Sequence, residues 1–444
     1  MNKSKRRSLL KRCLFITIIG FCFLLSSLIY IPAASSAPTE IDSACQGLNI
    51  EKIMAILADE ELSKQFAQTQ PDCYAWDLFI ALNWPGREDQ PWRPDPNKEI
   101  GNPGVVVWEG WKTTSEVFLP NGATPQPWGT QKQVPLEVLQ KAKEIGLPVD
   151  EPFQNIGSIQ QVSGLVFKAN EDNQGKPIRY ELAMNKSTFD YILGKNPYQT
   201  GLYKINGQEQ AAKSCQNSQI PAWDCIDFNW NAKEIKTSWL WLDKTNPQYD
   251  TINNTYITSN AYYQEIGKNG QPVIDSAGKP VYQVGRAALT GMHITSKALS
   301  NWVWTTFENV NNAKYTTSFI ELGIPEEAQA VNNQIQPLLR EKGSKYANYE
   351  LVGAQIGFNQ PTLLANSQIE SHFQPASSCI TCHAFASIAT KNTGPFRLSF
   401  VDTRGGNLSY YVGDIPQEIL DQIEQKEFIP MDFVWSLRLA KRQR

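Results

Sequence analysis

The pentapeptide Cys379-Ile380-Thr381-Cys382-His383 constrains this chain more than any other stretch. Its pattern, C-x-x-C-H, is the attachment sequence for a c-type haem. The thiols of Cys379 and Cys382 can each add to one vinyl group of a haem, and His383 can then ligate the iron on the proximal side. With 8 Cys and 3 His among 444 residues, shuffling gives roughly 0.001 occurrences of this pattern. We therefore expect the chain to fold around one covalently attached haem c.

Three other interpretations of the motif compete with haem attachment: a structural disulfide, a zinc site and a thiol redox centre. A zinc site needs further ligands, and the sequence contains no second C-x-x-C. A thioredoxin-like motif lies between a strand and a helix of a βαβ unit, which the preceding Ser377-Ser378 does not predict. Haem attachment is the favoured interpretation because the chain also begins with an export signal.

The export signal is predicted over residues 1–37, where a basic start precedes a long apolar run. The run from Cys13 to Ile31 spans 19 residues, and small residues follow it up to Ala37. We expect cleavage near Ala34 to Ala37, although a run of this length can also serve as an uncleaved membrane anchor. No later stretch approaches membrane-spanning length. The predicted location is therefore periplasmic or extracellular, with the N-terminal segment as the only membrane contact if it is uncleaved.

The charge of the mature chain makes nucleic acid a poor candidate for a partner. Residues 1–37 hold six basic residues and no acidic one, which leaves 35 basic against 44 acidic residues and a net charge near −9. Proteins that bind nucleic acid usually carry a basic patch or stripe instead. An acidic surface would steer a basic redox partner protein toward the chain.

Six cysteines remain after the signal, and four of them are left if the haem takes Cys379 and Cys382. In an oxidising compartment such cysteines form disulfides. Pairing of sequence neighbours, Cys45 with Cys73 and Cys215 with Cys225, is the simplest of the three connectivities that four cysteines allow.

The secondary structure predicted from residue patterns is mixed. Apolar residues that recur at spacings of three and four, with Pro and Gly at the ends, predict helices over 47–68, 74–82, 136–145, 325–342 and 416–425. Alternating or short apolar runs bounded by turn residues predict strands over 105–108, 165–168, 178–184, 237–242, 262–266, 273–275, 281–284, 302–307, 349–358 and 408–412. The three strands between 262 and 284 are expected to form a small antiparallel meander.

These elements predict an α+β fold, namely a body containing an antiparallel sheet with peripheral helices, followed by a C-terminal haem-bearing segment. The body is expected to cover residues 38–360. The cytochrome c-like haem-binding segment is expected over 361–444, after a Gln360-Pro361 break.

The sequence leaves several candidates for the second axial ligand of the iron. Met431 is the only methionine downstream of the motif, and a methionine ligand would raise the reduction potential and suit electron transfer. His293 is a second candidate and His372 a weaker one, because the chain has so few histidines. The alternative is an open or water-filled distal site. For each of these residues the alternative is a structural role in the packing of the core.

Four stretches that span most of the mature chain carry a resemblance: 72–85, 291–308, 364–384 and 432–437. They resemble a family of large secreted bacterial cytochrome c proteins with a single haem. The resemblance implies that the haem belongs to a body much larger than a small cytochrome. It also favours His293 as a functional residue, since His293 lies inside one of the matching stretches.

The leading functional hypothesis is an extracytoplasmic c-type haem protein that transfers electrons. A second is a haem enzyme or gas-binding protein with an open distal site, which the large body would shape. A third is a structural or interaction protein in which the haem is incidental. The sequence shows no G-x-S-x-G, H-E-x-x-H, P-loop or dinucleotide fingerprint, so it leaves open whether the chain is an enzyme.

Overall fold

The computed structural model describes residues 45–158, 170–194, 201–267, 271–317, 323–391, 395–402 and 409–443. They belong to one compact unit that comprises residues 42–444. Among these residues no helix is long and apolar enough to cross a membrane. The predicted export signal and the predicted strand over 165–168 lie outside the described residues.

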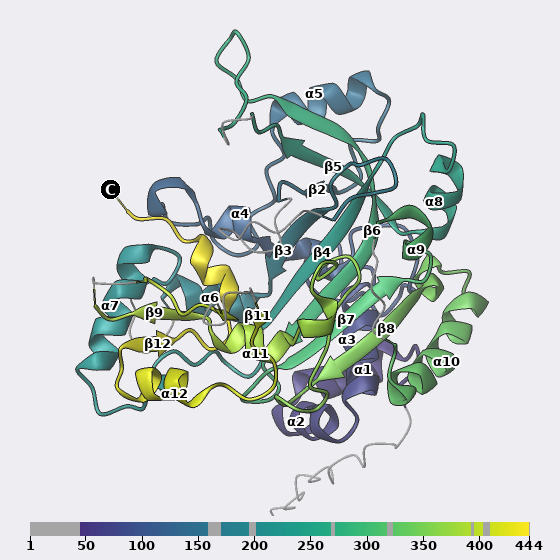
Figure 1. Cartoon of the computed structure of the whole chain (residues 1–444). Coiled ribbons are helices and arrows are strands. Elements are labelled where there is room, and N and C mark those ends of the chain that lie inside the picture. The colour runs from purple at the N-terminus through teal and green to yellow at the C-terminus, as the bar shows by residue number, and fades with distance from the viewer. Residues whose placement is uncertain are drawn as a thin grey trace, which may run out of the picture. The chain divides into compact units, whose positions relative to one another are not determined.

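A sheet of eight strands is the platform of the fold (Figure 1). Its long central strand, β6 (Tyr282–Ser296), pairs along one edge with β4 (Lys233–Leu242). Along its other edge, β6 pairs first with β5 (Thr258–Gln264) and then with β7 (Val303–Asn309). The remaining strands are β1 (Lys112–Thr113) and β3 (Arg179–Met184) beside β4, β2 (Phe153–Asn155) beside β5, and β8 (Tyr349–Gln355) beside β7. All pairs are antiparallel except β2 with β5.

The register of these strands decides which side chains share a face, because cross-strand partners point to the same side of a sheet. One row across β3, β4, β6 and β7 consists of Leu182, Lys236, His293 and Thr306. The neighbouring row consists of Met184, Glu234, Thr295 and Trp304. We call this side of the sheet the cavity face. The opposite side, which carries Met292 and Phe307, is the helix face.

Helices from both ends of the body cover the helix face. The helices α1 (Ile50–Ala58) and α2 (Glu60–Thr69) begin at Asn49 and Asp59, whose side chains accept backbone N–H groups of the first turns. The helix α3 (Pro71–Leu82) places Phe79 against Phe307, with ring centroids 4.2 Å apart. Trp76 of α3 donates to Asn332 of α10 (Glu326–Glu341), at 2.9 Å. This contact joins the N-terminal helices to α10 over the sheet.

The C-terminal residues lie on the cavity face (Figure 1). They contain the short helix α11 (Cys379–Ala384), the helix α12 (Gln417–Glu424), and two small sheets, β9 (Ser387–Ala389) with β12 (Phe428–Pro430) and β10 (Val401–Asp402) with β11 (Ser409–Tyr410). Next to them lie α6 (Lys186–Leu193) and α7 (Ile205–Gln216). The other described helices are α4 (Thr114–Val117), α5 (Leu136–Glu144), α8 (Tyr249–Thr255) and α9 (Asn312–Tyr315).

The predicted α+β class is confirmed, and so are the five predicted helical regions, the first of which is two helices. Two strand predictions are wrong. The stretch 105–108 runs into a 3₁₀ helix at Val107–Gly110, and 273–275 makes only an isolated bridge at Ile274. The strand predicted from Trp302 begins at Val303, because Trp302 has a φ of 60° and leaves the extended conformation.

Candidate haem site

The motif helix α11 is anchored to the sheet through β8. The side chain of Gln355 at the end of β8 accepts the N–H of Ile380 at 3.0 Å and donates to the Ser378 hydroxyl at 3.1 Å. The Thr381 hydroxyl donates to the carbonyl of Gly413 at 2.6 Å. Ile380 is fully buried in the apolar cluster beneath the helix. Hydrogen bonds from β8 and from Gly413 therefore fix the position of the motif helix. The side chains of Cys379, Cys382 and His383 face the sheet.

The two motif cysteines are free thiols, whereas the other four cysteines are paired as predicted. The structure forms disulfides between Cys45 and Cys73 and between Cys215 and Cys225. Burial raises the pKa of Cys379 well above its ordinary value and that of Cys382 to about 12. A thiol redox centre depends on a lowered thiol pKa. The structure thus gives two vicinal, neutral thiols and no disulfide at the motif.

His383 is held in a single orientation by the backbone. Its Nδ1–H donates to the carbonyl oxygen of Phe433 at 2.7 Å. A carbonyl only accepts hydrogen bonds, so the proton is on Nδ1 and Nε2 keeps its lone pair. Burial lowers the pKa of His383 to about 4, against the opposing effect of this hydrogen bond. The ring of Trp304 packs against the imidazole with centroids 4.3 Å apart. At neutral pH the side chain is therefore a neutral, oriented imidazole with Nε2 available as a ligand.

The carbonyl of Phe433 is itself fixed by the preceding residue. Asp432 and Phe433 both have a positive φ, at 47° and 66°, a conformation that non-glycine residues adopt only when their surroundings impose it. The Asp432 carboxylate accepts the N–H of Phe228 at 2.7 Å, the ammonium of Lys297 at 2.5 Å and the indole N–H of Trp302 at 3.2 Å. These three contacts hold the turn that presents the carbonyl to His383.

A cavity of about 650 Å³ extends from α11 across the cavity face of the sheet as far as α4, β2 and β5. Cys379, Cys382 and His383 all lie on its wall, to which strands β3, β4, β6 and β7 also contribute. Cofactor pockets typically measure about 300 to 1,000 Å³ and combine apolar walls with a few placed polar groups. The residues present therefore fit a haem, since two thiols, one imidazole nitrogen and a pocket of suitable size converge.

His293 lies on the wall of the same cavity. Its Nε2 is 3.1 and 3.2 Å from the two carboxylate oxygens of Glu370. Glu370 also accepts the N–H of Asn366 at 2.8 Å. Burial alone would raise the pKa of Glu370, but the charge and hydrogen bond of His293 lower it below its ordinary value. To ligate an iron through Nε2, His293 would have to leave Glu370, while Nδ1 has no such constraint.

The other two distal candidates lie elsewhere in the described structure. Met431 is fully buried in the apolar cluster, and its sulfur accepts a hydrogen bond from Arg397 at 3.0 Å. His372 is exposed. Neither belongs to the described residues that line the cavity. Of the three candidates, the structure brings only His293 together with the motif.

Residue patterns did not point to several groups that build this site. Glu370, Lys236, Trp304, Trp435 and Arg438 line the cavity beside the motif. A usable signal was present in β4, where the charged Glu234 and Lys236 lie at alternate positions on either side of the apolar Ile235. Such alternation marks a strand face that borders a polar cavity or solvent.

The zinc interpretation finds no ligand set in the described part of the chain. There, no group of three or more His, Cys, Asp and Glu side chains could hold a metal ion by itself. Structural zinc sites use four such ligands.

Comparison with protein-family models, with curated proteins and with solved structures finds no match for this chain.

Proposed function

We propose that this protein is an exported mono-haem c-type protein that transfers electrons. The observation that carries the proposal is the convergence of Cys379, Cys382 and His383 on one cavity of about 650 Å³. Cys379 and Cys382 would bind the haem covalently and His383 would be the proximal ligand. When bound, the haem supplies a one-electron couple between ferric and ferrous iron.

The residues around the motif would tune that couple. The hydrogen bond from Nδ1 of His383 to Phe433 raises the basicity of the imidazole, which stabilises the oxidised state. Trp304 and the buried neighbours of α11 exclude water, which favours the less charged, reduced state. These two effects act in opposite directions on the reduction potential.

The compartment in this proposal is the periplasm or the extracellular space. The two disulfides support it, because such bonds persist in oxidising compartments. The basic and apolar segment at residues 1–37 supports export. The proposed partner is a redox protein, and the acidic mature chain favours one with a basic surface.

A second candidate function, a haem enzyme or gas-binding protein, is favoured by the pair of His293 and Glu370. With Nε2 hydrogen-bonded to Glu370, His293 would act as a polar group toward a ligand of the haem rather than as a ligand of the iron. A histidine of this kind stabilises bound ligands by hydrogen bonding, as distal pocket polarity does in haem proteins generally.

Absorption spectra of the wild type, His293→Ala and Met431→Ala, each produced with the c-type maturation machinery, test these alternatives. A low-spin wild type that becomes high-spin only in His293→Ala supports electron transfer with two histidine ligands. The same change only in Met431→Ala assigns the ligand to Met431. A high-spin wild type that binds carbon monoxide when reduced supports the second candidate. A chain that carries no haem contradicts both.

A further inference from the structure

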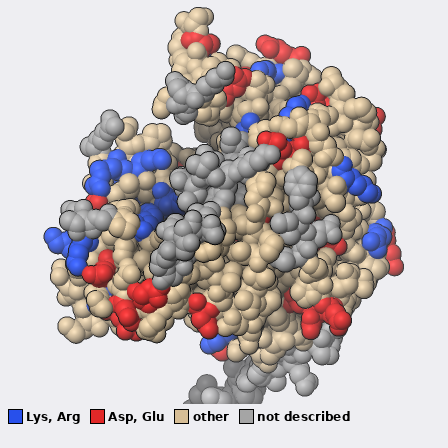
Figure 2. Space-filling model, in the orientation of Figure 1, with Lys and Arg blue, Asp and Glu red and all other residues tan. Residues whose placement is uncertain are grey.

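The cavity wall contains two basic side chains close to the motif, Lys236 and Arg438. Lys236 comes from β4, in the same row of the cavity face as His293. Arg438 comes from a 3₁₀ helix at Trp435–Leu439 near the C-terminus. The two residues are far apart in the sequence, so the fold alone brings them to one cavity. Basic side chains also gather on this side of the molecule in Figure 2, over α6, α7 and the C-terminal residues.

The position of Arg438 is fixed relative to the motif. Trp435 donates its indole N–H to the carbonyl of Cys382 at 2.8 Å, which ties the 3₁₀ helix to α11. Side chains three residues apart in a 3₁₀ helix lie one above the other, so Arg438 and Trp435 project from the same side of this helix. Its guanidinium lies 5.9 Å from the centroid of the Trp435 ring.

The two cations oppose each other across this cavity wall, because the charge of Arg438 lowers the pKa of Lys236 further than burial alone. The charge of Glu370 raises the pKa of Lys236, but Glu370 also binds His293. Two like charges that face one cavity are stabilised by an anionic occupant.

We propose that Lys236 and Arg438 form a clamp for the propionate carboxylates of the haem. This inference rests on the proposed function and adds to it how the cofactor is oriented. Haem has its carboxylates at one edge of the ring, and the cysteines would hold its vinyl groups at another edge. Arginine binds a carboxylate through a planar fork, whereas lysine binds as a point charge. The clamp would therefore fix the in-plane rotation of the haem before the thioether bonds form.

The test uses the full mature chain with Cys379→Ala and Cys382→Ala, so that binding is non-covalent. Haemin and haemin dimethyl ester, which has no free carboxylate, are titrated against this parent and against the same chain with Lys236→Met and Arg438→Gln. The parent should bind haemin roughly tenfold or more tightly than the ester, the difference expected for charge-assisted hydrogen bonds. In the variant the two ligands should bind with similar affinity. Arg442→Gln is the control, because Arg442 pairs with Glu209 at the surface, and it should preserve the preference.

The outcomes of this titration test whether Lys236 and Arg438 bind the haem carboxylates. Equal binding of haemin and ester by the parent overturns the clamp but leaves the haem cavity in place. A preference that persists in the Lys236→Met, Arg438→Gln chain overturns the assignment to these residues. Binding of succinate to a parent chain that does not distinguish haemin from its ester would assign the cations to free carboxylates instead. Binding of neither ligand contradicts the proposed function itself. If the double variant fails to fold by circular dichroism, Arg438→Lys and Lys236→Arg are used, which should reduce the preference only partly.

Discussion

The hydrogen bond from Nδ1 of His383 to the carbonyl of Phe433 determines which nitrogen of this histidine can bind a metal ion. It fixes the tautomer, orients the ring beside Trp304 and leaves Nε2 as the only ligand atom. The motif spacing predicts the identity of this histidine. The carbonyl that orients it is 50 residues further along the chain, and a backbone acceptor leaves no mark on a sequence.

The same limit applies to the distal side of the cavity. His293 was a candidate because histidine is rare in this chain, and the structure does place it on the cavity wall. Its partner Glu370 had no local signal, since the two residues are 77 positions apart. Met431 is the first candidate from its distance to the motif. Its burial against Arg397 reflects packing that depends on the whole C-terminal segment.

Glu181 gives a pH-dependent prediction at the residue scale. This carboxyl on β3 is 5 % exposed, and its Oε2 has no hydrogen-bond partner. Burial raises its pKa from 4.5 to about 7. Between these two values the folded chain keeps a proton that the unfolded chain has released, so the free energy of unfolding falls as pH rises, and the loss is complete above about pH 7. The loss attributable to Glu181 is about 3 kcal/mol at most.

Urea denaturation of wild type and Glu181→Gln at pH 5 and pH 8 measures this effect. The variant should lose less stability than the wild type between the two pH values, because a glutamine does not titrate. Glu144→Gln, on the exposed side of α5, should keep the wild-type profile. Identical profiles for wild type and Glu181→Gln would show that the carboxyl does not titrate in this range.

At the scale of elements, the turn at 431–433 is the part of the C-terminal segment that positions the histidine. Asp432→Ala removes the acceptor of Lys297, Trp302 and the Phe228 N–H, and leaves the buried ammonium with the exposed carboxylate of Asp227 and the carbonyl of Ser300. Removal of one partner of a buried ion pair costs about 3 kcal/mol. We expect Asp432→Ala to lower the free energy of unfolding by about that amount and to shift the haem absorption bands or the reduction potential.

The matched control for this prediction is Asp227→Ala. Asp227 binds the same ammonium at 2.9 Å, but its side chain is 65 % exposed. Exposed ion pairs contribute about 0 to 1 kcal/mol. Asp227→Ala should therefore leave both the spectrum and the stability close to wild type. A spectral change in Asp227→Ala equal to that in Asp432→Ala would contradict the role given to the turn.

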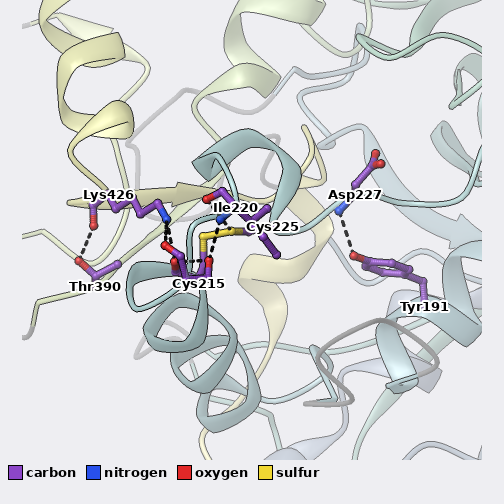
Figure 3. Close-up of a disulfide and its surroundings, with 8 residues drawn as sticks. Tyr191, Cys215, Ile220, Cys225, Asp227, Thr390 and Lys426 are labelled. Atoms are coloured by element: carbon purple, nitrogen blue, oxygen red, sulfur yellow. Dashed lines mark hydrogen bonds between the residues drawn. A yellow bond between two sulfur atoms is a disulfide. The ribbon is translucent and has the colours of Figure 1, made fainter. Parts of the chain in front are cut away.

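The two disulfides support different layers of the fold. Cys215 and Cys225 are buried in the apolar cluster that also contains Ile380 and Phe385 of the motif region. Lys426 donates to the carbonyl of Cys215 at 2.9 Å and so links α7 to the segment after α12 (Figure 3). Cys45 and Cys73 instead join the start of the described chain to α3, under the helix face.

Replacement of each disulfide by two alanines tests whether the two disulfides support different parts of the fold. Loss of either disulfide should lower the free energy of unfolding by about 3 kcal/mol in the chain-entropy model. Only Cys215→Ala with Cys225→Ala should also alter the haem spectrum, because only that pair packs with the motif. Denaturation followed by both fluorescence and haem absorption measures the two effects together. A spectral change in the Cys45→Ala, Cys73→Ala chain alone would contradict this assignment.

Most elements with a strong local pattern were predicted from the sequence. The helices α1, α2 and α10 carry apolar periodicity, α1 and α2 begin after capping residues, and α3 and α10 have a proline at or just before their first residue. The strands β3 and β4 contain alternating apolar residues. The helix α7 was missed because its composition is polar, and it is stabilised by tertiary packing against the C-terminal residues. The strand β6 was predicted only at its start. Its second half, around Gly291 and His293, lies between β4 and β7 and shows no simple alternation.

On the scale of the whole molecule, the sheet and the C-terminal residues build one site together. The cavity takes its cysteines and His383 from α11, but His293, Lys236 and Trp304 come from the sheet. Residues 42–444 accordingly form one compact unit. In this arrangement the C-x-x-C-H motif near the end of the chain depends on side chains of the sheet for its surroundings.

Expression of residues 361–444 alone tests whether the segment depends on the sheet. Without β4, β6 and β7, one wall of the cavity and the packing partner of His383 are missing. We expect the fragment to show no cooperative thermal transition by circular dichroism, whereas the full mature chain shows one. A fragment that unfolds cooperatively and has the haem spectrum of the full chain would show that the segment is a domain of its own.

The most direct test of the central claim is the intact mass of the mature chain after expression in the periplasm with the c-type maturation machinery, together with its pyridine haemochrome. We predict a mass increase equal to one haem and a c-type haemochrome spectrum for the wild type. The chain with Cys379→Ala and Cys382→Ala should show neither the added mass nor the c-type band. A folded wild-type chain with the mass of the polypeptide alone, or an unchanged mass increase in the cysteine variant, would contradict covalent haem attachment at this motif.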